Sequence, residues 1–185
     1  VGSEMCIRDS TYVVNITMFG YLFCIAVSQG GAITIGHLVG KGKIHGAFIL
    51  GKYVMRLALV ITVTLSVAIA SCGHSLMSLL TDNPEIISIG AALLWFDVLV
   101  EIGRPVNIFA TNALRATGDV NYPFYVGLIV MWSLQVAGGY LCGIYFGLGI
   151  YALWLMIASD EITRGIIFTR RWWSMKWAGK SFVTQ

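Results

Sequence analysis

The stretch Ile86–Leu114 reads IISIGAALLWFDVLVEIGRPVNIFATNAL, and it decides the fold because it is long and apolar yet carries charge. A membrane-spanning helix needs about 20 predominantly apolar residues. Within this stretch Asp97, Glu101 and Arg104 follow one another at helical spacing. A charge at the bilayer centre costs about 2.5–3.5 kcal/mol on insertion scales. The cluster therefore predicts a membrane helix whose charged face lies against protein or a water-filled cavity. Its charged side chains form either a transport site or a structural ion pair.

The composition indicates an integral membrane protein. Of the 185 residues, 57% are hydrophobic and only 11% are charged, whereas a soluble domain carries about 25% charged residues. The lipid bilayer is thus an expected partner, and nucleic acid is not, because no basic stripe interleaves with aromatic residues. The four cysteines are widely spaced and no nucleophile–base pair is recognisable. We expect no enzyme activity, no metal site and no cofactor.

The fold class predicted is all-α, a polytopic transmembrane bundle of about five helices. Turn-forming residues separate five apolar segments, and Pro84 and Pro123 stand where a first helical turn accepts proline. The five predicted spans are 11–39, 47–80, 86–114, 123–146 and 148–170.

The basic residues predict the orientation of the spans. If the spans alternate, ten of the 12 Lys and Arg residues fall on one side, while the opposite loops carry Asp82 and Glu85. The positive-inside rule places the basic side and the C-terminus in the cytoplasm of a multi-pass cell-membrane protein. The tryptophans that follow the last span fit an interfacial belt at that end: Trp172, Trp173 and Trp177.

The two ends of the chain read differently from its centre. Residues 1–10, VGSEMCIRDS, are polar and stop abruptly at an apolar segment, so we interpret them as a non-native leader. Residues 11–171 form the predicted transmembrane bundle, and residues 172–185 a cytoplasmic tail. If the leader is foreign, the chain is a fragment of a longer one.

The helical wheel of the third span gathers polar side chains on an arc of roughly 140°. Pro105 frees the backbone carbonyl of Glu101 and permits a kink at the cluster. A Glu101–Arg104 structural pair and a cavity-facing site both remain open. The arc contains Asp97, Glu101, Arg104, Asn107, Thr111, Asn112 and Arg115.

The fifth span also carries charged residues within an apolar segment: Asp160, Glu161 and Arg164. Asp160 and Arg164 are spaced to pair on one helix face. Across both spans four carboxylates meet two guanidinium groups, and the two surplus negative charges could hold a proton, a sodium ion or an organic cation. The alternative is that these side chains only brace one helix against another.

Three connections between the predicted spans carry a recognisable pattern: IGHLVGKGKIHGA at Ile35–Ala47, TDNPEII at Thr81–Ile87 and NALRATGDVNYP at Asn112–Pro123. They resemble the C-terminal half of multidrug and toxic compound extrusion (MATE) transporters. EIGRPVN at Glu101–Asn107 and SDEITRG at Ser159–Gly165 are similar to one bacterial branch of that family. The resemblance covers residues 11–180 and implies the last five of twelve helices, with an N-terminal lobe as the missing partner.

The resemblance implies electrochemically driven antiport of organic cations or amphipathic drugs against H⁺ or Na⁺. Two positions depart from the family pattern: His37 stands where Gln is usual, and Arg104 where the sodium-coupled branch has Asp. The departure at Arg104 shifts the expected ion site to Asp97, Glu101 and the carboxylates of the fifth span.

We therefore expect a fragment of a secondary antiporter. The alternatives are a lipid-linked oligosaccharide flippase of the same superfamily and a non-transporting structural membrane subunit. The expected ion- and substrate-binding residues are Asp97, Glu101, Arg104, Asn107, Asp160, Glu161 and Arg164.

Overall fold

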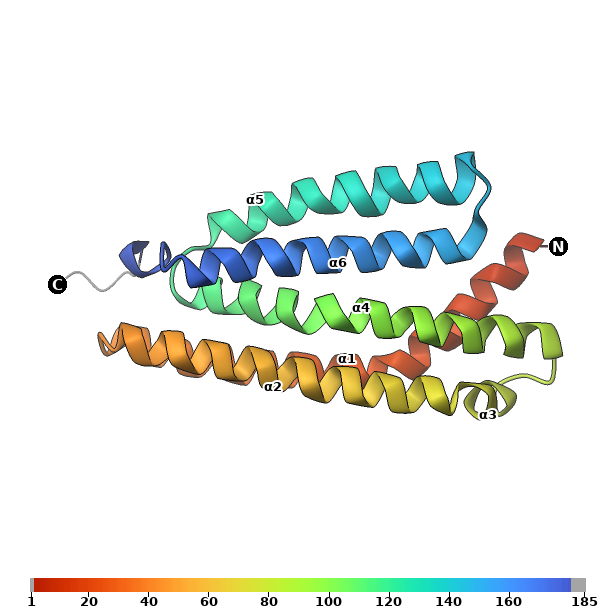
Figure 1. Cartoon of the computed structure of the whole chain (residues 1–185), viewed down its shortest axis with the longest axis horizontal. Coiled ribbons are helices and arrows are strands. Elements are labelled where there is room, and N and C mark those ends of the chain that lie inside the picture. Colours follow the sequence, from red (N-terminus) through yellow and green to blue (C-terminus); the bar gives the residue numbers. More distant parts are fainter. Residues whose placement is uncertain (1, 181–185) are drawn as a thin grey trace.

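The structure is a computed structural model that describes residues 2–180, with side chains described for residues 11–179. The described residues form helices and no strand, so the all-α prediction is confirmed. Successive long helices run in opposite directions, side by side along the long axis of the molecule (Figure 1). The elements are α1 (Gly2–Gly40), α2 (Ile44–Ser71), α3 (Gly73–Ser78), α4 (Pro84–Ala116), α5 (Asn121–Val130), η1 (Met131–Gly138), η2 (Tyr140–Tyr145), α6 (Gly149–Trp173) and η3 (Ala178–Lys180).

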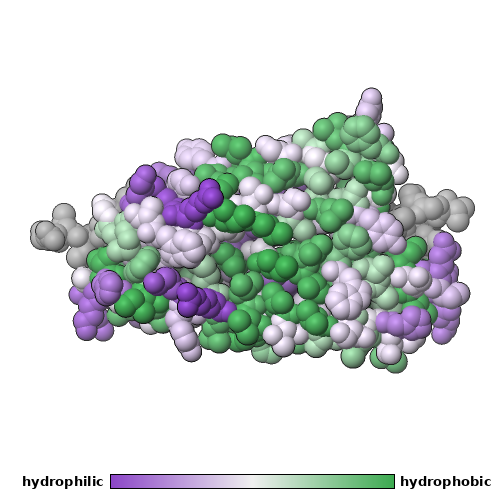
Figure 2. All heavy atoms as spheres, in the orientation of Figure 1, coloured by the Kyte–Doolittle hydropathy of each residue, from purple (hydrophilic) through white to green (hydrophobic). Residues whose placement is uncertain are grey.

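Five long helical segments match the predicted spans, and four of them are long and apolar enough to cross a membrane: 11–40, 44–71, 84–116 and 121–145. The last of these joins α5 to the π-helical segments η1 and η2. Helix α6 is 25 residues long, which is enough to cross a membrane, but its five charged side chains make it less apolar than the other four. Hydrophobic residues cover the middle of the molecule and the most hydrophilic ones lie toward its ends, as Figure 2 shows.

Two predicted boundaries differ from the structure. The second span does not continue to residue 80, because α2 ends at Ser71 and the short α3 follows after Cys72. Gly73, at this break, faces Leu94 of α4 so closely that a Cβ there would lie 3.0 Å from Leu94 Cδ1. Helix α1 begins at Gly2, so no helix boundary marks the end of the proposed leader, whose foreign origin stays a prediction.

Helix α4 is the centre of the bundle, since it packs against α1, α2, α3 and α6. It begins at Pro84, and the side chain of Asn83 caps it by accepting a hydrogen bond from the Glu85 backbone N–H at 3.0 Å. It ends before Gly118, whose φ of 93° suits glycine at the end of a helix. Because other helices surround α4, several of its polar residues lie inside the bundle.

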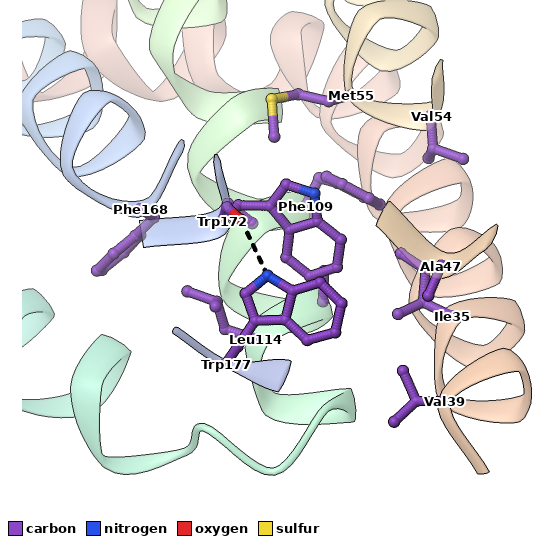
Figure 3. Packing of buried hydrophobic residues seen from close by; sticks show 12 residues of the cluster. Ile35, Val39, Ala47, Val54, Met55, Phe109, Leu114, Phe168, Trp172 and Trp177 are labelled. Carbon is purple, nitrogen blue, oxygen red and sulfur yellow. Dashed lines mark hydrogen bonds between the residues drawn. The ribbon is translucent and has the colours of Figure 1, made fainter. Parts of the chain in front are cut away.

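The predicted tryptophan belt is wrong for two of its three members. Trp172 and Trp177 are fully buried, and their rings stack with centroids 4.4 Å apart. The Trp177 indole N–H donates to the Trp172 carbonyl at 2.9 Å, as the dashed line in Figure 3 marks. The chain after α6 thus folds back so that Trp177 reaches the core. The Trp172 ring fits there because Gly51 of α2 has no side chain in its way. Trp173, 57% exposed, fits the prediction.

An ion pair fixes α6 to the connection between α4 and α5. Arg171 Nε donates to Asp119 Oδ2 at 2.8 Å, and the Asp119 carboxylate is fully buried. The Arg171 guanidinium also lies 4.5 Å from the centroid of the Tyr122 ring. This contact holds together two segments that are 52 residues apart.

We predict that Arg171→Gln destabilises this end of the bundle by about 3 kcal/mol, because it leaves the buried Asp119 charge without its guanidinium. The measurement is thermal unfolding of the complete protein in detergent. Lys176→Gln removes an exposed charge from the same end and serves as the control. Equal melting temperatures for the two variants would remove the ion pair from the account of stability.

Candidate ion and substrate site

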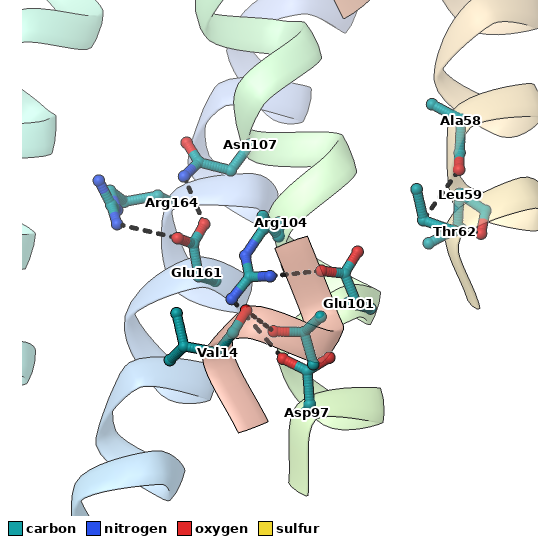
Figure 4. A network of polar contacts seen from close by, with 11 residues as sticks. Val14, Ala58, Leu59, Thr62, Asp97, Glu101, Arg104, Asn107, Glu161 and Arg164 are labelled. Atoms are coloured by element: carbon teal, nitrogen blue, oxygen red, sulfur yellow. Dashed lines mark hydrogen bonds and ion pairs between the residues drawn. The ribbon is translucent and has the colours of Figure 1, made fainter. Parts of the chain in front are cut away.

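The charged cluster of α4 is paired along its own helix. Arg104 Nη1 donates to Glu101 Oε1, and Arg104 Nη2 lies 3.8 Å from Asp97 Oδ1 (Figure 4). Asp97 and Glu101 are each only 2% exposed. The Arg104 guanidinium also faces the ring of Tyr21 on α1, 5.7 Å from its centroid. The spacing of these residues on one helix thus produced the expected pair, with a second carboxylate added.

The cluster of α6 has the same design. Arg164 Nη2 donates to Asp160 Oδ2, which confirms the expected pair, and lies 3.5 Å from Glu161 Oε1. Asp160 is buried, whereas the Glu161 side chain is 16% exposed. Each arginine therefore serves two carboxylates of its own helix.

One hydrogen bond joins the two clusters directly. Asn107 Nδ2 of α4 donates to Glu161 Oε2 of α6 at 2.6 Å, and Figure 4 shows Glu161 between Asn107 and Arg164. The Thr111 hydroxyl donates to Asn107 Oδ1 at 3.4 Å, which fixes the orientation of the amide. No hydrogen bond or ion pair between Glu101 and Asp160 is found among residues 11–179. The carboxylate that meets the other helix is Glu161.

Two glycines that the sequence analysis passed over bring α4 and α6 together. A Cβ on Gly103 would lie 2.5 Å from the backbone nitrogen of Ile162, and one on Gly165 would lie 3.3 Å from the Gly103 carbonyl oxygen. At position 103 only glycine allows the two helix backbones to approach so closely, whereas a Cβ at position 165 fits after a shift of a few tenths of an ångström. Gly103 lies in the segment EIGRPVN and Gly165 in SDEITRG. A glycine beside each charge cluster was thus the feature of the sequence that could have predicted the close contact.

Several carboxylate oxygens in the site lack a full set of partners. Glu101 Oε2 and Asp160 Oδ1 are buried and accept no hydrogen bond from the described residues. Asp97 Oδ1 accepts none either, although Arg104 Nη2 approaches it to 3.8 Å and the Ser66 side chain contacts the same carboxyl group. Unsatisfied buried acceptors of this kind are unfavourable unless a proton, an ion or water meets them. Four carboxylates against two guanidinium groups leave the surplus of negative charge that the sequence predicted.

Two cavities open beside this charge. One, of about 430 Å³, lies between α4, α5 and α6 and includes Asn107, Glu161 and Arg164 in its wall. The other, of about 330 Å³, includes Arg104, Gln135 and Glu161. Tyr21 and Glu161 line both cavities. Glu161 is therefore the acidic group most open to a ligand, whereas Asp97, Glu101 and Asp160 line neither cavity and lie behind it.

The MatE family model matches residues 10–141, which is most of the chain. The chain belongs to the MatE family. The resemblance in its connecting segments to multidrug and toxic compound extrusion proteins is thus confirmed.

Three relatives illustrate the match. An uncharacterized transporter, YisQ, of Bacillus subtilis (strain 168) is 37% identical over 177 residues, covering 96% of this chain and 39% of the relative. Multidrug resistance protein MdtK of Photorhabdus laumondii is 25% identical, covering 88% and 36%. A probable multidrug resistance protein NorM of Neisseria meningitidis serogroup B is 27% identical, covering 80% and 33%. No solved structure matches significantly.

The chain is much shorter than the relatives it matches. The chain spans about two fifths of the YisQ relative and less of the other two. This is consistent with the interpretation of the chain as a fragment.

We predict that the Asn107–Glu161 bond couples α4 to α6 by about 1 kcal/mol, within the range for hydrogen bonds between side chains of neighbouring membrane helices. The measurement is a double-mutant cycle of Asn107→Ala and Glu161→Gln, read as unfolding free energy. A matched cycle pairs Asn107→Ala with Glu85→Gln, an exposed carboxylate at the start of α4. Additive effects in both cycles would show that the bond does not join the helices.

Proposed function

We propose that the protein containing this chain is a secondary antiporter that exports organic, often cationic, compounds in exchange for H⁺ or Na⁺. Membership of the MatE family and the similarity to multidrug resistance proteins support transport. The observation that carries the proposal is the surplus of buried negative charge next to two cavities. A cation is the ligand that such charge attracts.

The proposed mechanism divides the carboxylates into two groups. Glu161, which lines both cavities, meets the organic cation together with the ring of Tyr21. Asp97 and Glu101, buried behind Arg104, hold the coupling proton or sodium ion. Asp160 holds Arg164 in place beside Glu161, so that the cation must displace part of an existing ion pair.

Binding in one group changes the charge that the other group meets. Arg104 pairs with Asp97 and Glu101 at once, so protonation of either carboxylate leaves it free to turn toward the remaining one. Tyr21 and Arg104 both line the smaller cavity, which places this change next to the bound cation. Rocking of this part against a lobe outside the chain would then supply alternating access.

The orientation we propose places the end of the bundle with Lys41, Lys43 and Arg171 in the cytoplasm. These residues lie at the end where α1 passes to α2 and where α6 finishes (Figure 1). The positive-inside rule supports this side, and helix α6 ends there too.

An oligosaccharide flippase is less well supported. Its anionic substrate needs free basic side chains within the membrane, and the two arginines within the charge clusters, Arg104 and Arg164, are both paired with carboxylates. Within the two clusters negative rather than positive charge is in surplus, and Arg115 is the further basic residue that lines the larger cavity.

We predict that Glu101→Gln in the complete protein lowers the initial rate of dye efflux from energised vesicles by about tenfold or more, equivalent to about 1.4 kcal/mol of lost ion binding. The amide keeps an acceptor for Arg104 but not the charge. Membrane insertion and yield stay at the wild-type level.

Glu85→Gln, which removes an exposed carboxylate from the same helix, is the control and keeps full efflux. Imposed gradients of pH and of Na⁺ then identify the coupling ion. Wild-type efflux by Glu101→Gln would exclude Glu101 from the mechanism.

A further inference from the structure

An apolar groove of about 400 Å³ runs along the contact between α4 and α6, apart from the charged site. Its walls are Ile102 and Val106 of α4 and Ile162 and Ile166 of α6. None of the six charged residues of the two clusters lines it. The groove is therefore a feature that the proposed transport mechanism does not use.

The glycine contact explains why the groove exists. Gly103 and Gly165 are buried, line the groove and have no side chains to fill it. The walls rise on either side, with Ile102 44% exposed and Ile166 50% exposed. The apolar walls of the groove are of the kind that a hydrocarbon chain packs against.

The groove has the length of one leaflet. From Ile162 to Trp173 the helix rises about 16 Å at 1.5 Å per residue, and half the hydrocarbon core of a bilayer is about 15 Å thick. Its inner end lies at the level of the charge clusters, and its outer end at the last turn of α6.

The outer end of the groove carries an unpaired positive charge. The exposed side chain of Arg170 lines it and makes no hydrogen bond or ion pair with residues 11–179, unlike its neighbour Arg171. Trp173 lies at the same end with 57% of its surface exposed. A basic residue and an exposed tryptophan at the membrane surface suit an anionic lipid headgroup.

We propose that the groove binds one acyl chain of an anionic phospholipid, whose phosphate group contacts Arg170. The apolar walls take the chain, and the free guanidinium selects the negative headgroup. This site lies on the other side of the Gly103–Gly165 contact from Glu161, and its occupation does not require transport.

The test is native mass spectrometry of the complete purified protein with equal amounts of phosphatidylglycerol and phosphatidylcholine. We expect the wild type to retain phosphatidylglycerol preferentially. Arg170→Gln should lower that retention about fivefold, the effect of one basic residue near an anionic lipid surface. Lys176→Gln, an exposed lysine near the same end but outside the groove, should leave it unchanged.

A second pair of variants tests the groove itself. Ile166→Trp should fill the groove and reduce retention, while Leu155→Trp, an exposed position of α6 outside the groove, should not. A photo-crosslinking residue at position 166 should capture lipid.

Equal retention by Arg170→Gln and wild type, or no preference between the two lipids, would overturn the proposal. So would cross-linking of position 166 to another segment of the chain or to a second copy. The Arg170 variant changes an exposed side chain, so it keeps the test decisive if Ile166→Trp does not fold. Loss of dye efflux with intact lipid retention would affect only the proposed function.

Discussion

Charge inside the membrane has to be neutralised before α4 and α6 can pack, and the structure does this within each helix. Arg104 pairs with Asp97 and Glu101, and Arg164 pairs with Asp160 and approaches Glu161. Each helix therefore reduces its own insertion cost without waiting for its partner. Association is then left to close backbone packing at Gly103 and Gly165 and to the single bond from Asn107 to Glu161.

The α4–α6 contact separates two environments. On one side lie the surplus carboxylates and the cavities that Tyr21 and Glu161 line, and on the other lies an apolar groove that ends at Arg170. The proposed cation site and the proposed lipid groove can thus lie back to back, because glycines form the closest contact between the helices. In this account the glycines are as important to function as the charges.

The sequence predicts what depends on neighbours along the chain. The spacing of Asp97, Glu101 and Arg104 gave their shared face, and that of Asp160 and Arg164 gave their pair, because helical periodicity is a local property. It could not give the bond from Asn107 to Glu161, 54 residues away, which depends on how two helices cross. The burial of Trp172 was missed for the same reason, because the space for its ring comes from Gly51 on another helix. Tryptophan suits both a membrane interface and a core, so composition alone does not decide between them.

The most direct test of the central claim is a disulfide across the α4–α6 contact. A Cβ at position 165 would lie 3.6 Å from Val106 Cβ, within the range of a disulfide. In the complete protein, with native cysteines replaced, Val106→Cys with Gly165→Cys should cross-link rapidly under mild oxidation in the membrane. Val106→Cys with Thr169→Cys, one turn further along α6, should react far more slowly. Equal rates for the two pairs, or no bond in the first, would contradict the packing on which both proposed sites depend.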